Sequence, residues 1–390
     1  MKNLSFFSVL FLAAWCISPP LVAGTVYRVI AVVLLFIVCV DSFKWATPRH
    51  RKGLYIAIFL SMYMIGIALI HGENFAQRIN LFVLLLYSSV FSIWMQNPTV
   101  SSKRLHFVIL WILIFFSIWN TTTIRAVLEQ PNIMRLLAKN EIYEDFNVSL
   151  WGVGGYGYMY AAIMILPVGF DMLMGSRIKL NLTSRAITLY FVLSTLVMSY
   201  LSQYFMALII AVIIAILGLR KGGEATLSKG AYASIFFIFL IIGISIEPIL
   251  DFLIDVIDLP IINNKLIDFR AVLNGAEVED SDFGERYERY TRDLRLMFSN
   301  PIFGSQTYMS IGKHSTFLDI LAQYGFFIGA LTIHLLLRPS LEWINRKLPV
   351  ANNVFIAFLI FGLLNSVTMN SATSLYIALP VYCKLIWQKS

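Results

Sequence analysis

Charged residues are scarce in this chain of 390 residues, where Asp, Glu, Lys and Arg make up 13% and hydrophobic residues 58%. An ordinary soluble domain carries about a quarter charged residues, so the composition excludes that class. Cysteine is equally scarce. Cys16, Cys39 and Cys383 fall in separate apolar stretches without CxxC spacing, which excludes a disulfide framework and the usual zinc and redox motifs.

The short motifs of common cofactor and hydrolase sites are also missing. The sequence contains no metal-ligand spacing, no GxSxG and no dinucleotide fingerprint. A glycine group at 152–157 could present backbone N–H groups to a phosphate, or simply allow helix packing, but the P-loop lysine pattern is absent. Internal repeats and low-complexity segments are lacking too. We therefore expect a protein without a metal or other cofactor.

Long apolar runs are what the sequence has instead. A membrane-spanning helix needs roughly 20 apolar residues, so the sequence predicts an all-α, polytopic membrane protein of about twelve spans. We expect the first run to be retained as a span rather than cleaved as a signal peptide. The break near Tyr200 leaves alternatives open, since one long bent helix or a re-entrant pair would also fit. The runs lie at about 4–18, 25–43, 53–70, 79–96, 105–121, 151–174, 186–199, 200–219, 230–248, 315–337, 353–369 and 372–387.

The basic residues indicate an orientation. The net charge of +8 could suggest nucleic acid, but the Lys and Arg residues are scattered through short loops, as positive-inside bias produces. We expect no nucleic-acid partner, and a cytoplasmic face carrying most of the 30 basic residues. These are Lys2, Lys44, Arg49, Arg51, Lys52, Lys103, Arg104, Arg177, Lys179, Arg185, Arg220, Lys221, Lys229, Arg338, Arg346, Lys347, Lys384 and Lys389.

Ten of the other twelve basic residues gather in two large loops on the opposite, periplasmic side. Membrane insertion does not favour arginine there, so we interpret both loops as functional. The chain then divides into residues 1–248, with nine helices and a loop at 122–150, a large loop at 249–313 with an amphipathic helix, and three helices at 314–390. The loops carry Arg125, Arg135, Lys139, Lys265, Arg270, Arg286, Arg289, Arg292, Arg295 and Lys313.

The segment 282–299 reads as an amphipathic helix on the outer membrane surface. It begins at a D-x-x-E capping box, Asp282 to Glu285, and should stop before Asn300-Pro301. Its apolar face is expected to carry Tyr287, Tyr290, Leu294, Met297 and Phe298, with Arg286 at the border and Arg289, Arg292 and Arg295 winding to the polar side. Ion pairs of the arginines with Glu285, Glu288 and Asp293 are the plain alternative.

The next span begins with a further group of candidates. His314 stands at its mouth, where a histidine can accept a proton or orient a hydroxyl at neutral pH, or simply pack. Asp319 lies deeper in the same helix. An acid at membrane depth is a functional candidate, with pairing to a neighbouring helix as the alternative. Gly325 and Gly329 form a GxxxG pair, which we interpret as a helix-packing site.

The segment from Arg286 to Gly329 resembles the O-antigen polymerase and O-antigen ligase superfamily of bacterial envelope glycosyltransferases. Members typically show arginine and an aromatic residue on a periplasmic helix ending in Asn-Pro-hydrophobic-Phe-Gly, then a His-Asn/Ser heading a helix with a glycine pair. The matching residues here are Arg286, Arg289-Tyr290, Asn300-Pro301-Ile302-Phe303-Gly304, His314-Ser315, Phe317-Leu318, Gly325 and Gly329.

This resemblance implies a GT-C-like fold in the bacterial inner membrane, multi-pass, with a metal-independent site facing the periplasm. It implies transfer of a polysaccharide repeat unit from undecaprenyl diphosphate to a sugar hydroxyl of another lipid-linked repeat. The partners implied are the undecaprenyl-diphosphate-linked oligosaccharide, membrane lipid and a chain-length regulator protein. The catalytic residues would be His314, Arg286 and Arg289, and the substrate-binding residues Arg125, Arg135, Arg270, Arg292, Tyr290, Gln203 and Asp319.

Two departures from the family pattern bear on this interpretation. Members often carry Ser-Arg where this chain has Ser202-Gln203, so Arg125 or Arg135 would have to supply that arginine. Ile328 occupies a place that is usually small or polar in the ligases, which favours polymerase over ligase. A flippase or other transporter for lipid-linked oligosaccharides is the alternative from another class, but such proteins tend to show paired halves and midplane charges.

Overall fold

The computed structural model describes the chain at residues 2–72, 75–131, 133–139, 152–175, 178–202, 204–219, 246–256, 260–273, 282–307, 311–312, 315–346, 348–365 and 371–388. Within these ranges every regular element is a helix. The all-α prediction is therefore confirmed for the described part of the chain.

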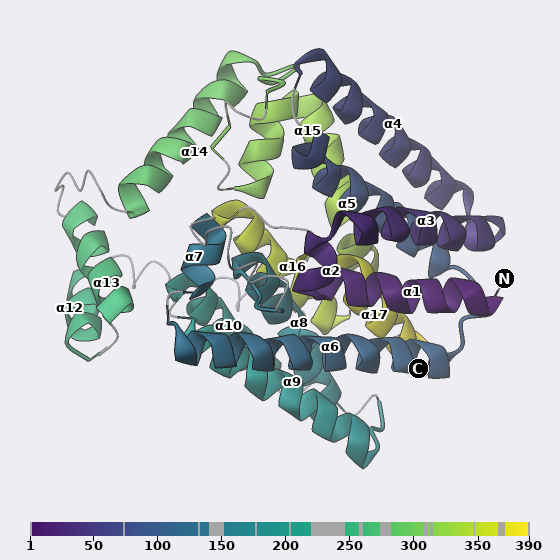
Figure 1. Cartoon of the computed structure of the whole chain (residues 1–390), viewed down its shortest axis with the longest axis horizontal. Helices are drawn as coiled ribbons and strands as arrows, with labels where there is room; N and C mark the ends of the chain where they lie inside the picture. Colours follow the sequence, from purple (N-terminus) through teal and green to yellow (C-terminus); the bar gives the residue numbers. More distant parts are fainter. Residues whose placement is uncertain are drawn as a thin grey trace.

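Most helices are arranged as a bundle, and α12, α13 and α14 lie along one side of it (Figure 1). Most expected apolar runs coincide with a helix, whereas the run at 230–248 lies almost entirely outside the described residues. The elements are α1 (Lys2–Ile17), α2 (Pro19–Ala23), α3 (Thr25–Ser42), the 3₁₀ turn η1 (Phe43–Trp45), α4 (Pro48–Ile70), α5 (Phe75–Trp94), α6 (Ser102–Glu129), α7 (Ile133–Lys139), α8 (Tyr156–Met174), α9 (Leu182–Leu201), α10 (Phe205–Leu219), α12 (Ile246–Val256), α13 (Pro260–Leu273), α14 (Asp282–Ser299), α15 (Thr316–Ile344), α16 (Pro349–Leu364), the π-helical turn η4 (Ser374–Ala378) and α17 (Leu379–Trp387).

Six of the described helices are long and apolar enough to cross a membrane. They are α3 continued through η1, α4, α6, α8, α9 and α15, and four shorter apolar helices accompany them. The protein is thus an α-helical membrane protein by the length and composition of its helices. The count of twelve spans stays a prediction.

Local sequence signals explain where several of these helices begin. The Ser101 hydroxyl accepts a hydrogen bond from the Arg104 backbone N–H at the start of α6, and the Asn181 side chain accepts one from Ser184 N–H at the start of α9. Such caps satisfy N–H groups that a helix start leaves without partners. Pro48 and Pro349 stand in the first turns of α4 and α16, where a missing N–H costs nothing.

Long-range contacts bring several basic segments that the sequence predicts to be cytoplasmic to one end of the bundle. The Arg104 guanidinium donates to the Asn3 side chain at 3.0 Å, and the Lys384 ammonium donates to the Met95 carbonyl at 2.6 Å. Figure 1 shows both chain termini at this same end. Three further contacts join the same end: His106 with Ser184, Arg338 with the Arg49 carbonyl, and Arg346 stacked over Trp387. These contacts fit helices of alternating direction, as the predicted topology requires.

The bundle core lies around α8 and α17. Nearly all residues of η4 and α17 are buried, and α8 is buried along most of its length. Polar side chains within this core pair with one another: the Asn120 amide donates to Ser194 and Thr195, and the Tyr158 hydroxyl donates to Asn120. Such pairing replaces the water that a membrane interior lacks.

One expectation about helix boundaries needs adjustment. The loop expected from 122 is still helical up to Glu129, so Arg125 lies on α6 rather than in a loop. The apolar run simply continues as Thr and Ile residues that a helix tolerates. The predicted break near Tyr200 is confirmed, because α9 ends at Leu201 and α10 begins at Phe205. Tyr204, just before α10, stacks on Tyr156 at the start of α8, with ring centroids 4.6 Å apart.

The predicted topology can be tested with reporter fusions. A reporter fused after Gly275 is expected to be periplasmic and one fused after Gly222 cytoplasmic, because the basic segments gather at one end of the bundle. Alkaline phosphatase and green fluorescent protein fusions at both positions measure this. A cytoplasmic signal from the fusion after Gly275 would contradict the predicted orientation.

Candidate functional site at the junction of α14 and α15

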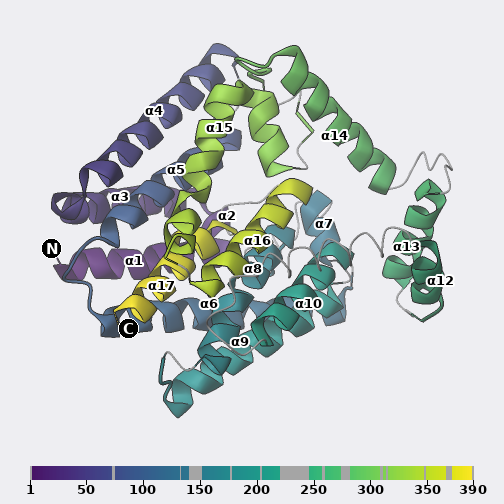
Figure 2. The same cartoon turned by 180° about the vertical axis from the view of Figure 1, so that it is seen from behind.

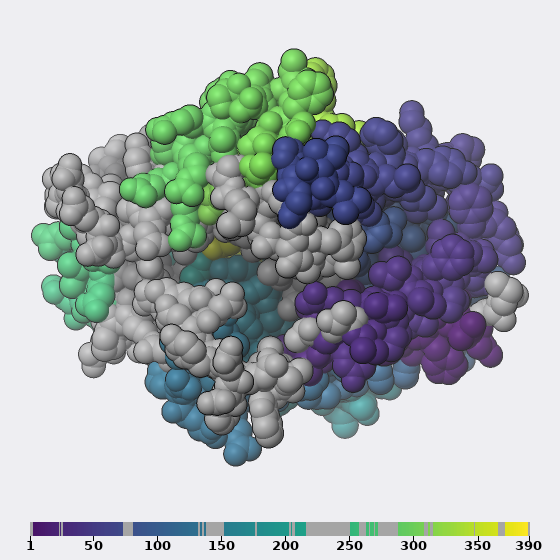
Figure 3. Space-filling model, turned by 45° about the horizontal axis from the view of Figure 1, so that its top comes forward, coloured from purple at the N-terminus to yellow at the C-terminus, as the bar shows by residue number. Residues whose placement is uncertain are grey.

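The helix α14 has the bounds that the capping box and Asn300-Pro301 predicted, Asp282–Ser299. Figures 1 and 2 show it at the edge of the molecule, beside the first part of α15. Figure 3 shows this region beside the end of α4, where His71 and Gln306 lie 3.4 Å apart. The described part of the segment that carries the family resemblance therefore consists of α14, a turn after it and α15.

A turn after α14 closes onto a break in α15. Gly325 has φ +73°, which interrupts the helix. Three backbone N–H groups bridge turn and break: Ser305 donates to the Ala322 carbonyl, Gln306 to the Gln323 carbonyl and Phe326 to the Pro301 carbonyl, at 2.7–2.9 Å. A helix break frees carbonyl and N–H groups inside a membrane protein, and here the turn satisfies them.

This geometry corrects the interpretation of the glycine pair. We expected Gly325 and Gly329 to allow close packing of two helices, but Gly325 is the break itself. A side chain there would overlap the Ile302 carbonyl, and one at Gly329 would touch Ile320 and Leu321 of the same helix. Gly304, with φ +68°, meets the Gln323 backbone from the other side. Both positive-φ positions require glycine.

Replacing Gly325 by Ala should destabilise the protein by on the order of 2–4 kcal/mol, because a left-handed Ala is strained and its methyl group overlaps backbone. The measurement is the thermal unfolding midpoint in detergent. Gly66→Ala is the matched control, since Gly66 lies in helix α4 with open space around it, and Ala there should be neutral or mildly stabilising. Equal midpoints for the two variants would contradict this account.

A buried carboxyl group holds α14 to α15. The Asp293 side chain has no exposed surface, accepts a hydrogen bond from Gly312 N–H at 2.7 Å and bonds with the Asp319 carboxyl. Asp319 is also buried. The predicted alternative for Asp319, pairing with a neighbouring helix, is therefore observed.

Burial raises the pKa of Asp293, although the Gly312 N–H, Asp319 and Arg292 act in the opposite direction. A carboxyl whose pKa is raised on folding stabilises the fold below its ordinary pKa, and this contribution is lost as the pH rises through the folded value. Asp293→Asn should therefore flatten the dependence of stability on pH and should raise stability at neutral pH. The Asn side chain can still accept from Gly312 and donate to Asp319.

Thermal unfolding midpoints of the wild type and Asp293→Asn across pH 4 to 8 measure this effect. Glu288→Gln serves as the control, because Glu288 is exposed on the same helix and should leave the pH profile unchanged. An unaltered profile in Asp293→Asn would show that the buried carboxyl does not titrate in this range.

Five helices converge beside this carboxyl pair. The Tyr290 hydroxyl donates from α14 to the Leu364 carbonyl at the end of α16, at 2.9 Å. The next residue, Asn365, accepts from the hydroxyls of Tyr160 on α8 and Tyr204 before α10, at 3.2 and 2.7 Å. Its backbone carbonyl accepts from Thr316 N–H at the start of α15. This junction fixes α14 against the membrane helices.

The predicted catalytic residues belong to the helices of this junction or directly precede them: Arg286 and Arg289 are part of α14, and His314 comes just before α15 in the sequence. Arg289 is half-buried and Arg292 exposed, as the helical spacing predicted. Arg286 belongs to α14, but its side chain lies outside the described residues, as does His314. The described neighbours of His314 are both held: Gly312 by Asp293, and Ser315 by a bond from its hydroxyl to the Gly362 carbonyl.

Two of the other predicted binding residues, Arg125 and Arg270, form ion pairs with residues of other helices or of their own helix outside this junction. Arg125 is on α6 and pairs with Glu129 at 3.1 Å, and Arg270 on α13 pairs with Asp251 of α12 at 2.9 Å. Figures 1 and 2 show α6 apart from α14, and α12 and α13 beside the bundle. Arg135 belongs to α7, with its side chain outside the described residues, and Gln203 is also outside them.

Asp293 and Asn365 were missed as site residues by the sequence reasoning. The sequence does contain an indication for Asp293, because this residue stands three residues after Tyr290 and four before Met297, on the apolar face of α14. A charged residue on an apolar face indicates a buried partner. The sequence contains no such indication for Asn365, since an Asn at the end of an apolar run is an ordinary helix stop.

Within the described residues, no three His, Cys, Asp or Glu side chains gather as a metal site would require. The metal-independent site stays a prediction. Comparison with known proteins adds no assignment: no protein-family model matches the chain, and no curated protein matches it.

Proposed function

We propose that this chain is a polysaccharide repeat-unit polymerase of the O-antigen type in the bacterial inner membrane. It would transfer a glycan from undecaprenyl diphosphate to a sugar hydroxyl of another lipid-linked repeat at the periplasmic face. The bond between the anomeric carbon and the diphosphate oxygen breaks, the acceptor oxygen bonds to that carbon, and the hydroxyl proton leaves through a base.

One observation carries this proposal. Described pieces of the segment that resembles the polymerase and ligase superfamily contact one another: the turn after α14 bonds to the break at Gly325, and Asp293 accepts a hydrogen bond from Gly312. A resemblance by chance would not require these separate motif pieces to contact one another. The arginines of α14 stand on this segment, away from the end of the bundle where the inner-loop basic residues gather.

Within this proposal the arginines serve the leaving group. Arg286 and Arg289 clamp the diphosphate, because a guanidinium can donate two parallel hydrogen bonds to phosphate oxygens. Arg292 adds positive charge from the exposed side. His314 accepts the proton of the attacking hydroxyl. Arg135 and Gln203 stay predicted substrate-binding residues, whereas Arg125 and Arg270 form ion pairs with Glu129 and Asp251.

Tyr290 and Asp319 are better understood as positioning residues than as substrate ligands. The Tyr290 hydroxyl bonds to the Leu364 carbonyl, and the Asp319 carboxyl bonds to Asp293. Both contacts fix α14 relative to α15 and α16. The arginines would thus be held in place before substrate binds, which lowers the cost of organising them in the transition state.

The ligase is the second candidate, with lipid A–core as acceptor in place of a second lipid-linked repeat. The sequence favours the polymerase only through Ile328. A flippase would need charged groups along a central pathway, whereas the arginines of the proposed diphosphate clamp stand on α14 at the edge of the molecule.

A reconstituted assay tests the proposed reaction. Purified protein given only an undecaprenyl-diphosphate-linked repeat should release undecaprenyl diphosphate and form glycans of two or more repeats, with or without EDTA. Transfer that occurs only when lipid A–core is added would identify a ligase. No release with either acceptor would contradict the proposal.

A further inference from the structure

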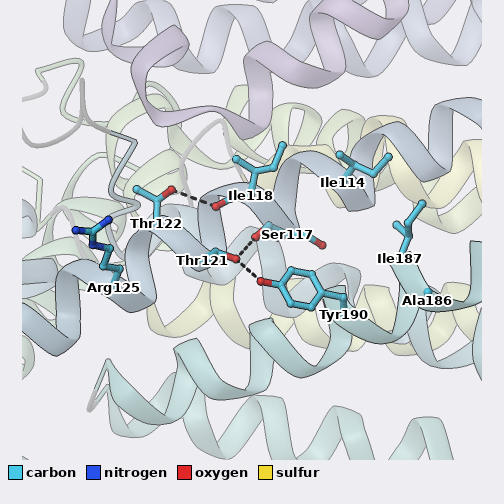
Figure 4. A pocket seen from close by; sticks show the side chains of 9 residues that line it. All are labelled: Ile114, Ser117, Ile118, Thr121, Thr122, Arg125, Ala186, Ile187 and Tyr190. Carbon is cyan, nitrogen blue, oxygen red and sulfur yellow. Dashed lines mark hydrogen bonds between the residues drawn. The ribbon is translucent and has the colours of Figure 1, made fainter. Parts of the chain in front are cut away.

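An open groove of about 740 Å³ runs between α6 and α9 on the surface of the bundle (Figure 4). The α6 residues that line the groove are three or four positions apart, from Ile114 through Ile118 to Arg125. This spacing means that one face of α6 forms one wall of the groove. Ile187 and Tyr190 of α9 form the other wall. Both helices are long and apolar enough to cross a membrane, so the groove opens toward lipid.

The groove is apolar although hydroxyl groups line it. The hydroxyls of Ser117, Thr121 and Thr122 each donate to the carbonyl four residues earlier in α6. The Tyr190 hydroxyl is joined to Thr121 at 2.7 Å. Because these hydroxyl groups are hydrogen-bonded within the protein, the residues present methyl groups and small side chains to the groove rather than unpaired polar atoms. The small side chains also hollow the surface.

Arg125 provides the single charged group in the lining of this groove. Figure 4 shows it at one end, beyond Thr121 and Thr122. Its Nε atom donates to Glu129, and both residues are largely exposed. A guanidinium has five N–H donors, so four remain for an anion that reaches this end of the groove.

We propose that the groove binds an anionic phospholipid, with one acyl chain between α6 and α9 and the phosphate at Arg125. An acyl chain fits because the walls are apolar and face the bilayer. An anionic headgroup fits because the cation stands only at the end of the groove, as a chain-plus-phosphate ligand requires. This site is separate from the α14–α15 junction, since Figures 1 and 2 show α6 and α9 apart from α14. Lipid binding in the groove does not depend on glycan transfer.

Native mass spectrometry tests this lipid-binding proposal. Phosphatidylglycerol and phosphatidylcholine with the same acyl chains are offered in equal amounts to the purified protein. The wild type should retain phosphatidylglycerol preferentially. Arg125→Gln should lower bound phosphatidylglycerol about fivefold, the usual effect of one basic residue at a membrane surface, and leave phosphatidylcholine unchanged. Arg125→Lys, which keeps the charge, should retain most of the binding.

A second variant tests the chain-binding part. Ala186→Trp fills the groove and should lower retention of both lipids, whereas Leu189→Trp adds the same side chain at an exposed position of α9 outside the lining and should not. Size-exclusion chromatography and melting midpoints confirm that each variant is folded. Equal retention of phosphatidylglycerol by the wild type, Arg125→Gln and Ala186→Trp would overturn the proposal. Parallel loss of both lipids in Arg125→Gln would overturn the assignment of the phosphate to Arg125.

Discussion

Replacement of Arg289 by Lys is expected to lower glycan polymerisation by about 10- to 100-fold although the positive charge is kept. Arg289 is half-buried on α14, where part of its hydration is lost. A planar guanidinium can form two parallel bonds to a diphosphate, whereas an ammonium acts as a point charge. Loss of one charge-assisted hydrogen bond costs about 1.5–3 kcal/mol, which corresponds to this range of rates.

Rates of undecaprenyl diphosphate release by the purified variant measure this effect. Arg295→Lys is the matched control, because Arg295 is an exposed arginine of the same helix, six residues further on, and should retain most activity. Arg286→Lys should behave like Arg289→Lys. Wild-type rates in both Arg286→Lys and Arg289→Lys would remove the diphosphate clamp from the mechanism.

Replacement of His314 by Ala is expected to slow turnover by about 10²- to 10⁴-fold, the usual contribution of a positioned general base. Its neighbours Gly312 and Ser315 are bonded to α14 and α16. These bonds hold the described residues on either side of position 314. We expect the variant to fold, insert and bind the lipid-linked donor with nearly unchanged affinity.

A separate determination of donor affinity and single-turnover rate distinguishes the two roles of His314. Loss of a catalytic histidine lowers the rate and leaves the donor affinity unchanged. Loss of a structural histidine lowers the melting midpoint, the donor affinity and the rate together. His314→Gln, which keeps a hydrogen-bonding side chain, should restore stability but not turnover. Near-normal turnover in folded His314→Ala would exclude the residue from the chemistry.

Much of the fold could be predicted from the sequence, because lipid imposes a strong constraint on chain pattern. Apolar runs located the helices, since a span in lipid must satisfy its backbone internally. The bounds of α14 followed from Asp282 and Asn300-Pro301, where local capping and proline geometry decide the ends. The helical spacing also predicted that Arg292 is more exposed than Arg289.

The tertiary part of the site could not be predicted, because it depends on contacts between distant residues. A GxxxG pair permits both a helix crossing and a helix break, and only the approach of Ile302 and Gly304 decides for the break at Gly325. Likewise, spacing put Asp293 within reach of arginines, but the bond to Gly312 and the contact with Asp319 come from the packing of α14 on α15.

The most direct test of the polymerase proposal is the lipopolysaccharide ladder of a strain that lacks this gene. A polymerase joins repeats to one another and does not attach them to the core, so its loss should leave lipid A–core carrying a single repeat. Complementation with the wild-type gene should restore the ladder. A deletion strain whose core carries no repeat would contradict the proposal, because that result identifies a ligase or a flippase.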